Sequence, residues 1–313
     1  MLKWLINRAP ATAGPLRHVF LPMPERLLEI SSASARKPHV ASSDVDEFST
    51  IISSLWINQT NKRTARGRLP ETLQAISRAL PPASQCLRFL DLGASDAVST
   101  YDAVCYFRDE RGIPITAHAV DLYTQLHRYD GRFLSEYRTS DGSPVLVRVG
   151  RLGLRLGRPL AFRPFEMLRN AYLRTHSVRD RLCDVLAIPL IHPLAAADPD
   201  VTVAEADALL DRPEFHDAFN VVRICNLLNR SYFSAAQMET IVGHAVSYLE
   251  IGGLLVVSRN ETGDDETTER GTVWRREQQG LTWQSDFNGG SELRGLIARF
   301  EATQVAEPAR IAA

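Results

Sequence analysis

The sequence predicts an α/β fold built on a doubly wound, mostly parallel, seven-stranded sheet of the Rossmann-like type. Three observations predict it. Short apolar runs of strand length alternate with segments of helical periodicity. Residues 87–92 form such a run and lead through Gly93 into a polar helix start, which is typical of a buried parallel strand followed by a tight turn. Near the C-terminus two runs flank Gln278-Gln279-Gly280, which predicts an antiparallel strand there.

The first 42 residues contain five prolines and a Ser/Ala cluster, so we expect a loosely structured arm. From residue 45 apolar side chains recur at helical spacing. A second helix is predicted to begin at Pro70 and to end at Pro81-Pro82. After the turn at Gly93, a helix through 103–108 leads to a second buried strand at 115–122.

Residues 122–199 do not follow the strand and helix alternation and predict an inserted α+β segment. A turn-rich stretch at 139–144 precedes a partly alternating hairpin at 145–157, and residues 165–186 show helical spacing. Residues 128–182 hold twelve arginines, no lysine and five acids. We interpret this insertion as a lid or a substrate-binding segment.

The α/β alternation resumes at residue 201. Strands are predicted at 201–207, 219–225 and 254–258, then an antiparallel pair at 272–275 and 281–285, with helices at 235–249 and 292–300. With the two earlier strands this makes seven. The predicted organisation is therefore an arm at 1–42, an α/β domain at 43–121 and 200–313, and the insertion at 122–199.

Composition narrows the class of protein. Of 313 residues, 44% are hydrophobic and 23% are charged, as in ordinary globular proteins, and the net charge of −1 indicates no general attraction to nucleic acid. The four cysteines lack C-x-x-C spacing and the histidines lack H-x-x-x-H spacing, so neither a zinc site nor a disulfide scaffold is expected. No run approaches the ~18 apolar residues of a membrane span, and a cytoplasmic protein is expected.

The turn after residue 92 has the chemistry of a ligand site. Gly93 permits a backbone that a side chain would block, and Ser95 or Asp96 can cap the next helix while its N-terminus leaves donors for a ligand. The dinucleotide fingerprint G-x-G-x-x-G is matched only at its first glycine, and no phosphate loop with Gly-Lys-Ser/Thr is present. The acid Asp91 favours a ligand with positive charge instead.

A second acid ends the second predicted strand. Asp121 follows Gly93 by 28 residues, about one strand–helix–strand unit. A carboxylate at the end of a parallel strand can accept hydrogen bonds from ribose hydroxyls. The sequence therefore predicts a nucleoside-type ligand beside the turn.

The stretch from Asp91 through Leu-Gly-Ala-Ser to Asp96 resembles the first motif of class I S-adenosylmethionine (SAM) methyltransferases. The resemblance extends over about residues 65–121 and 200–300. It implies that Asp91, Gly93, Ser95 and Asp96 form the SAM loop and that Asp121 holds the ribose. The cofactor it implies is S-adenosyl-L-methionine, and the activity is methyl transfer.

The resemblance also assigns residues beyond the loop. Asp207 and Ala208 are similar to the acid and small residue that meet the adenine, although Asp207 can equally be a helix cap. Asn226, after the fourth strand, is either a ligand contact or a residue that satisfies main-chain groups of the turn. Ala97 and Asn220 depart from the family pattern, which more often has Gly and Asp. These departures keep open a second hypothesis, a non-catalytic SAM-fold binding or regulatory protein that acts through its basic insertion.

Partners are predicted only by class. We expect a small-molecule or protein methyl acceptor, and nucleic acid is not indicated. Residues 145–163 allow peripheral contact with anionic lipid, with Leu152, Leu154, Leu156 and Phe162 between arginines. The sequence identifies no general base and no oligomeric state.

Overall fold

The computed structural model describes residues 24–34, 41–57, 60–61, 65–81, 86–130, 134–149, 152–156, 167, 170–171, 184–262 and 267–301. The chain forms two compact units. We call one the sheet unit; it consists of Gly67–Ala94, Ser99–Leu122 and Asp200–Ala313. The other, the companion unit, consists of Met1–Arg66, Ser95–Val98 and Tyr123–Pro199. Each is described by itself.

The sheet unit contains the predicted seven-stranded sheet, in the order β10-β4-β3-β11-β12-β13-β14. The first five of these strands are parallel, whereas β13 is antiparallel to both of its neighbours. The predicted fold class is therefore confirmed. The strands are β3 (Leu87–Leu92), β4 (Ile115–Asp121), β10 (Val201–Glu205), β11 (Phe219–Cys225), β12 (Leu249–Thr262), β13 (Thr267–Glu277) and β14 (Gly280–Phe287).

The strand order fixes where a ligand can bind. From β3 the chain proceeds outward through β4 to β10, and then returns to β11 on the other side of β3. In open α/β sheets, ligands bind outside the carboxyl ends of the strands where the order reverses in this way. That point lies between β3 and β11.

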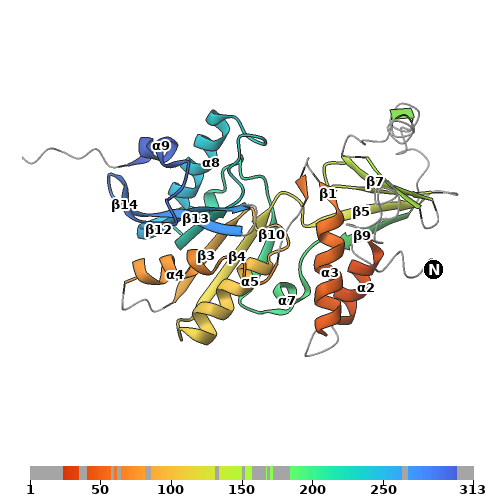
Figure 1. Ribbon diagram of the computed structural model, residues 1–313, viewed down its shortest axis with the longest axis horizontal. Helices are drawn as coiled ribbons and strands as arrows, with labels where there is room; N and C mark the ends of the chain where they lie inside the picture. Colours follow the sequence, from red (N-terminus) through yellow and green to blue (C-terminus); the bar gives the residue numbers. More distant parts are fainter. Residues whose placement is uncertain are drawn as a thin grey trace, which may run out of the picture. The chain divides into compact units, whose positions relative to one another are not determined.

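Helices cover both faces of this sheet (Figure 1). Helices α8 (Ala235–Tyr248) and α9 (Arg294–Ile297) pack on one face. Helices α4 (Pro70–Ala79) and α5 (Val98–Val104) pack on the other, with a π-helical continuation, η3 (Cys105–Glu110). The sequence explains where two of these helices begin. Pro70 is the first residue of α4, and Ser234 and Gln237 form a capping box at the N-terminus of α8.

The companion unit contains a five-stranded antiparallel sheet in the order β8-β7-β6-β5-β9. Helix α2 packs against β9 and against α3 and α7. The strands are β5 (Gln125–Asp130), β6 (Ser135–Arg138), β7 (Pro144–Val149), β8 (Leu152–Arg155) and β9 (Asp184–Pro189), and the short pair β1 (Trp56–Ile57) and β2 (Thr60–Asn61); the helices are α2 (Glu25–Ser34), α3 (Ser42–Ser54) and α7 (Pro193–Ala197).

The companion unit departs from the sequence prediction at two places. Residues 43–66, expected in the α/β domain, cluster with the insertion, and residues 25–34 of the expected loose arm form a helix. The reason is apolar burial, because Leu27 and Ile30 of α2 and Phe48 and Ile52 of α3 are fully or almost fully buried. Residues 1–23 lie outside the described residues.

The predicted helix at 165–186 is wrong at its end. Residues 184–186 belong to β9 and pair with β5, with Leu186 opposite Arg128. The run 185–190 is apolar throughout, and periodicity does not separate helix from strand in so short a run. Most of residues 165–183 lie outside the described residues.

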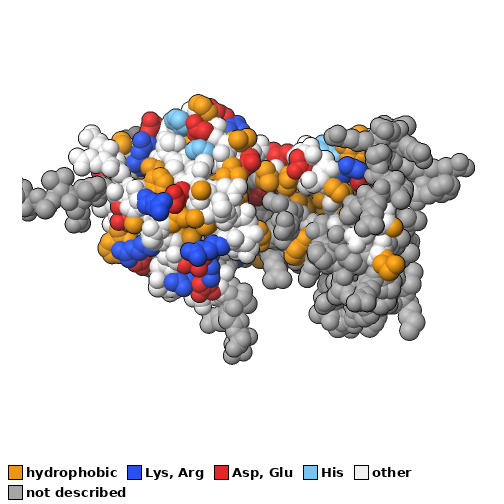
Figure 2. Space-filling view, turned by 90° about the horizontal axis from the view of Figure 1, so that it is seen from above, with side chains coloured by type: hydrophobic (Ala, Val, Ile, Leu, Met, Phe, Trp, Pro, Cys, Tyr) orange, Lys and Arg blue, Asp and Glu red, His pale blue; other side chains and the backbone are white. Residues whose placement is uncertain are grey.

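Surface features bear on the expected partners. In the described part of the chain, no helix is long and apolar enough to cross a bilayer. In the segment proposed to touch lipid, Val145, Leu146, Val147 and Leu156 are buried, and the side chains of Leu152, Leu154 and Phe162 lie outside the described residues. Figure 2 shows basic and acidic side chains interspersed on the visible face of the sheet unit. This mixture is typical of solvated ion pairs rather than of a phosphate-binding surface.

Candidate functional site

The turn after β3 has an unusual backbone. Gly93, Ser95 and Ala97 alternate with other residues and have φ angles of +78°, +61° and +64°. A residue with a Cβ is strained in this left-handed region by roughly 1–2 kcal/mol. Strained backbone of this kind clusters at ligand clamps and active sites. The turn thus adopts a glycine-like path at positions where the sequence has serine and alanine.

Main-chain hydrogen bonds tie the start of this turn to the neighbouring strand. The amides of Gly93 and Ala94 donate to the carbonyl of Val120 on β4, at 2.8 and 3.0 Å. A Cβ built on Gly93 would lie 3.0 Å from Cβ of Leu227. Leu227 thus covers the open side of Gly93, so the missing side chain already has a packing role.

Asp91 does not face the ligand region with a free carboxylate. It is 2% exposed and forms a buried ion pair with Arg223 on β11, the residue directly opposite in register. Arg223 Nε donates to Oδ1 at 3.0 Å, Arg223 Nη2 donates to Oδ2, and Thr100 Oγ1 donates to Oδ2 at 2.6 Å. The positive charge expected from a ligand is supplied here by Arg223.

Arg223 is completely buried in the sheet unit. Burial lowers its pKa, but Asp91, with smaller contributions from Cys225 and Glu269, raises it, and the net shift is upward. The guanidinium also lies over the Phe89 ring, 5.1 Å from the centroid. Its Nη1 has no hydrogen-bond partner among the described residues.

Asp121 ends β4 as predicted and is half-buried. It lies directly beside Glu205, the last residue of β10, and Ala206 N donates to its carbonyl at 2.9 Å. Two carboxylates therefore stand at adjacent strand ends. Carboxylate oxygens accept hydrogen bonds, so this pair suits a ligand with hydroxyl donors such as a ribose.

Asp207 acts in the turn that follows β10. Its Oδ1 accepts a hydrogen bond from Leu209 N at 2.9 Å, and its carbonyl accepts one from Leu210 N at 3.0 Å. A turn and not a helix follows Asp207, so the helix cap that the sequence allowed is wrong, and the carboxylate instead binds the main chain of that turn. Ala208 is half-buried, and its carbonyl accepts a hydrogen bond from His244 Nδ1 at 3.1 Å.

Asn226 follows β11 in the left-handed conformation, with a φ of +57°. It links the end of β11 to β12, because its main-chain N donates to Ser258 O at 3.0 Å and its side-chain Oδ1 accepts from Asn260 N at 2.8 Å. The residue is exposed. It therefore satisfies main-chain groups, as one of its two interpretations predicted, and its surface stays accessible.

Ser95 and Asp96 belong to the companion unit and are described there. Asp96 is fully buried; its Oδ1 accepts from Val98 N at 3.1 Å, and its carbonyl accepts from His192 N at 2.8 Å. Asp96 thus caps the start of α5, as predicted. His192 is also fully buried, and burial, with the nearby Arg66, lowers its pKa to about 4.

A buried polar layer extends across the α4 and α5 face of the sheet unit, near the carboxyl ends of the strands. It consists of Asp91, Arg223, Cys225, Ser258, Glu269, Thr72, Ser99 and Thr100, each at most 6% exposed. Glu269 accepts hydrogen bonds from the amides of Glu71 and Thr72 at 3.1 and 3.2 Å and from Thr72 Oγ1, which also lies 2.9 Å from Ser258 Oγ. On this face the core is therefore apolar in the middle of the sheet and polar near the carboxyl ends of the strands.

The sequence analysis missed Arg223 and Glu269. A signal for Arg223 was present, since Arg223 is the one charged residue of the run 221–225 and Asp91 is the one charged residue of 89–92. Buried charges are normally paired, so the two residues predict each other. Glu269 lies in an acid-rich segment and gave no comparable signal.

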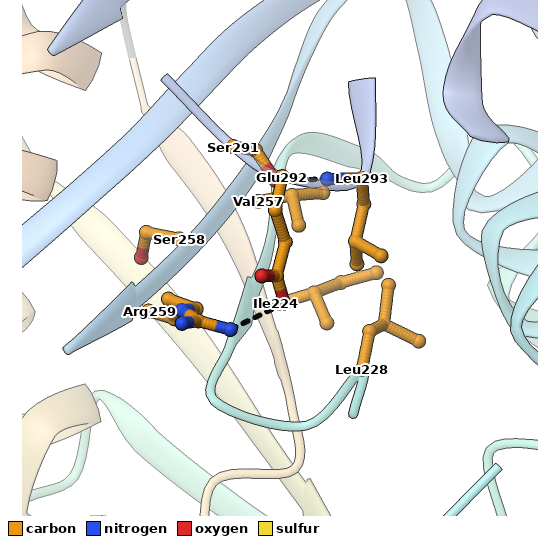
Figure 3. A pocket seen from close by; sticks show the side chains of 8 residues that line it. All are labelled: Ile224, Leu228, Val257, Ser258, Arg259, Ser291, Glu292 and Leu293. Atoms are coloured by element: carbon orange, nitrogen blue, oxygen red, sulfur yellow. Dashed lines mark hydrogen bonds and ion pairs between the residues drawn. The ribbon is translucent and has the colours of Figure 1, made fainter. Parts of the chain in front are cut away.

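A small cavity lies at the carboxyl ends of β11 and β12 (Figure 3). Its volume is about 10 Å³, enough for roughly one water molecule. The apolar side chains of Ile224, Leu228 and Leu293 face it, and an ion pair between Arg259 and Glu292 lies beside it. In this conformation the cavity is far smaller than a ligand pocket.

Comparisons with known proteins were made by sequence and by structure. Neither a protein-family model nor a curated protein matches the sequence. Solved structures that match include the Haemonchus contortus phosphoethanolamine N-methyltransferase 2 with S-adenosylhomocysteine, at 14% identity and a TM-score of 0.31. The match covers 67% of this chain and 33% of that one.

A second matching structure is the SAM-bound amino pentose methyltransferase CalS10 of Micromonospora echinaspora. Its identity is 14% and its TM-score is 0.28, with 67% of this chain and 64% of that chain covered. The chain thus spans about a third of the first relative and less than two thirds of the second.

Proposed function

We propose that the sheet unit binds S-adenosyl-L-methionine and transfers its methyl group to a small-molecule or protein acceptor. The observation that carries the proposal is the turn after β3, which is left-handed at Gly93, Ser95 and Ala97. It lies where the strand order reverses, the place where open α/β sheets bind ligands. Ser95 and Ala97 hold this path although their side chains disfavour it, which is typical of a functional constraint.

The proposed contacts differ in kind. Asp121 accepts hydrogen bonds from the ribose hydroxyls, and the backbone at Gly93 and Ala94 borders the ligand, while Ser95 and Asp96 act indirectly through the path of the turn. Ala208 and the exposed Asn226 border the ligand at the ends of the next strands. Asp91 and Asp207 act indirectly, because both carboxylates already bind groups of the protein.

The cofactor, when bound, supplies an activated methyl group. The task of the chain is then to bring a nucleophile in line with it and to exclude water. A general base is required only for a nucleophile that arrives protonated. In this scheme the carboxylates of Asp121 and Glu205 position the ligand and do not act as the base. Whether a general base is needed depends on the protonation state of the methyl acceptor.

Isothermal titration calorimetry with SAM and S-adenosylhomocysteine tests the proposal. We expect binding of both ligands and a loss of at least ~1 kcal/mol in the Asp121→Ala variant, the scale of a hydrogen bond to a charged group. Asp109→Ala is the matched control, since Asp109 is an exposed carboxylate of the same unit. Unchanged affinity in Asp121→Ala contradicts the ribose assignment, and absence of binding to the wild type contradicts the proposal.

A second candidate function is a non-catalytic binding or regulatory protein that acts through its basic insertion. Two observations favour it, because both make the turn less suited to a cationic ligand: Leu227 covers the open side of Gly93, and Arg223 neutralises Asp91. The calorimetric titration separates the two functions. A folded wild type that binds neither SAM nor S-adenosylhomocysteine supports the second, and a labelled methyl product from methyl-labelled SAM contradicts it.

A further inference from the structure

The two ends of the turn after β3 are tied together by side chains. Asp91 lies two positions before Gly93, where the turn begins. Ser99 and Thr100 lie after the turn, at the start of α5. Thr100 Oγ1 donates to Asp91 Oδ2 at 2.6 Å, which closes a direct link across the turn. All three residues belong to the sheet unit and are at most 4% exposed.

Arg223 extends this link from the neighbouring strand. Its Nε and Nη2 bind the two carboxylate oxygens of Asp91, and Nη2 also lies 3.3 Å from Ser99 Oγ. One guanidinium thus contacts both the entry and the exit of the turn. The planar fork of arginine provides this geometry, whereas the single ammonium of lysine does not.

Stability alone is a poor reason for this arrangement. A buried ion pair is often no more stabilising than apolar side chains of the same volume. The turn, however, contains two left-handed residues with side chains, Ser95 and Ala97. Such strain persists only when the surrounding structure over-determines it, and the contacts of Arg223 and Asp91 do this at both ends.

We propose that Arg223 is a positioning residue that holds the turn 93–98 in its left-handed form and thereby sets the affinity for the adenosyl ligand. We call the contacts among Asp91, Ser99, Thr100 and Arg223 the clamp. Asp91 acts as part of this clamp and does not contact the ligand. The inference rests on the proposed function for its effect on binding. Its effect on the turn itself is independent of any ligand.

The variant Arg223→Lys tests the clamp because it keeps the positive charge and removes the fork. We expect the Kd for S-adenosylhomocysteine to rise at least tenfold and the amides of Gly93 and Ala94 to exchange with solvent at least tenfold faster. The control is Arg108→Lys, since Arg108 forms an ion pair with Asp200 in the same unit. Wild-type affinity together with wild-type exchange in Arg223→Lys overturns the proposal.

A second variant covers the case in which Arg223→Lys fails to fold. The double substitution Asp91→Leu with Arg223→Met removes both buried charges together, which leaves neither one unpaired. We expect a folded protein with a Kd at least tenfold higher and with fast exchange at Gly93 and Ala94. A folded double variant that matches the wild type in both measurements refutes the clamp.

The two proposals fail in different ways. If the wild type binds neither SAM nor S-adenosylhomocysteine, the proposed function is wrong, and hydrogen exchange alone then decides on the clamp. Slow exchange at Gly93 and Ala94 in the wild type and fast exchange in Arg223→Lys support it. Equal exchange in the two proteins rejects it.

Discussion

Glu269 on β13 caps the first turn of α4 by binding Thr72 through both its amide and its hydroxyl. The two residues are 197 positions apart in the chain. A carboxylate at a helix N-terminus is stabilised by the free amides and by the helix dipole. The contact fastens the antiparallel end of the sheet to the helix that precedes β3.

The same carboxylate predicts a pH dependence of stability. Burial raises the pKa of Glu269, while bonds from Thr72 and the charge of Arg223 oppose this shift. The folded protein therefore binds this proton more tightly than the unfolded chain, and the contribution of Glu269 is lost as pH rises above about 4.5. Denaturant unfolding from pH 4.5 to 8 should show the wild type losing stability relative to Glu269→Gln. A difference that is constant with pH contradicts the shift.

His192 predicts the opposite trend in acid. Its pKa is lowered from 6.5 to about 4, so the folded protein resists a proton that the unfolded chain accepts. Stability is complete above pH 6.5 and falls by about 3 kcal/mol as pH decreases to 4. The His192→Asn variant keeps an acceptor for Leu194 N and lacks the titrating ring. Its stability should not show this fall, and nuclear magnetic resonance of the wild type should find a neutral ring at pH 5.

Asn220 has a structural role at the start of β11. At the amino end of β11 its Oδ1 accepts from Arg88 N at 2.7 Å, and its Nδ2 donates to Glu250. Asn220→Asp replaces that donor by a second carboxylate, and we expect a loss of about 1 kcal/mol in stability with unchanged SAM affinity. Adding Glu250→Gln restores a donor and should recover the loss. Reduced affinity in Asn220→Asp would instead connect this strand end to the ligand.

Gly271 is required by close packing. A Cβ there would lie 2.5 Å from Cζ of Phe287 and 2.7 Å from Cβ of Ser258. Gly271→Ala should therefore destabilise the protein by about 1–3 kcal/mol, the usual cost of overpacking. Gly295→Ala is the control, since its Cβ would meet no atom within 4 Å. In thermal unfolding, Gly271→Ala should melt at a lower temperature than Gly295→Ala. Equal melting temperatures contradict the packing argument.

The sheet could be predicted because each strand of 87–92, 115–121 and 219–225 is a short apolar run with turn residues on both sides. Length, flanking turn residues and composition together identify such runs as strands. The local sequence pattern also located Asp121 at a strand end and Asp96 at a helix start. Strand ends and helix starts of this kind depend on residues that are neighbours in sequence.

The role of Asp91 depends on a residue 132 positions away. Its sequence neighbours predict an acid that faces a ligand, whereas the partner on β11 turns it into part of a buried pair. The strand β9 was misjudged because its pairing with β5 lies in tertiary structure and not in its periodicity. The left-handed path of Ser95 and Ala97 likewise has no local signature, because neither residue favours it.

The companion unit is assembled from separate stretches that end only at residue 199. The last stretch of this unit is therefore synthesised only after β3 and β4 of the sheet unit. Strands β3 and β4 emerge earlier, yet β4 finds its outer neighbour only when β10 follows the insertion. During synthesis the outer edge of β4 keeps unpaired N–H and C=O groups for about 80 residues, and the other edge of β3 does so until β11 follows. Protection by a chaperone in that interval would favour correct pairing.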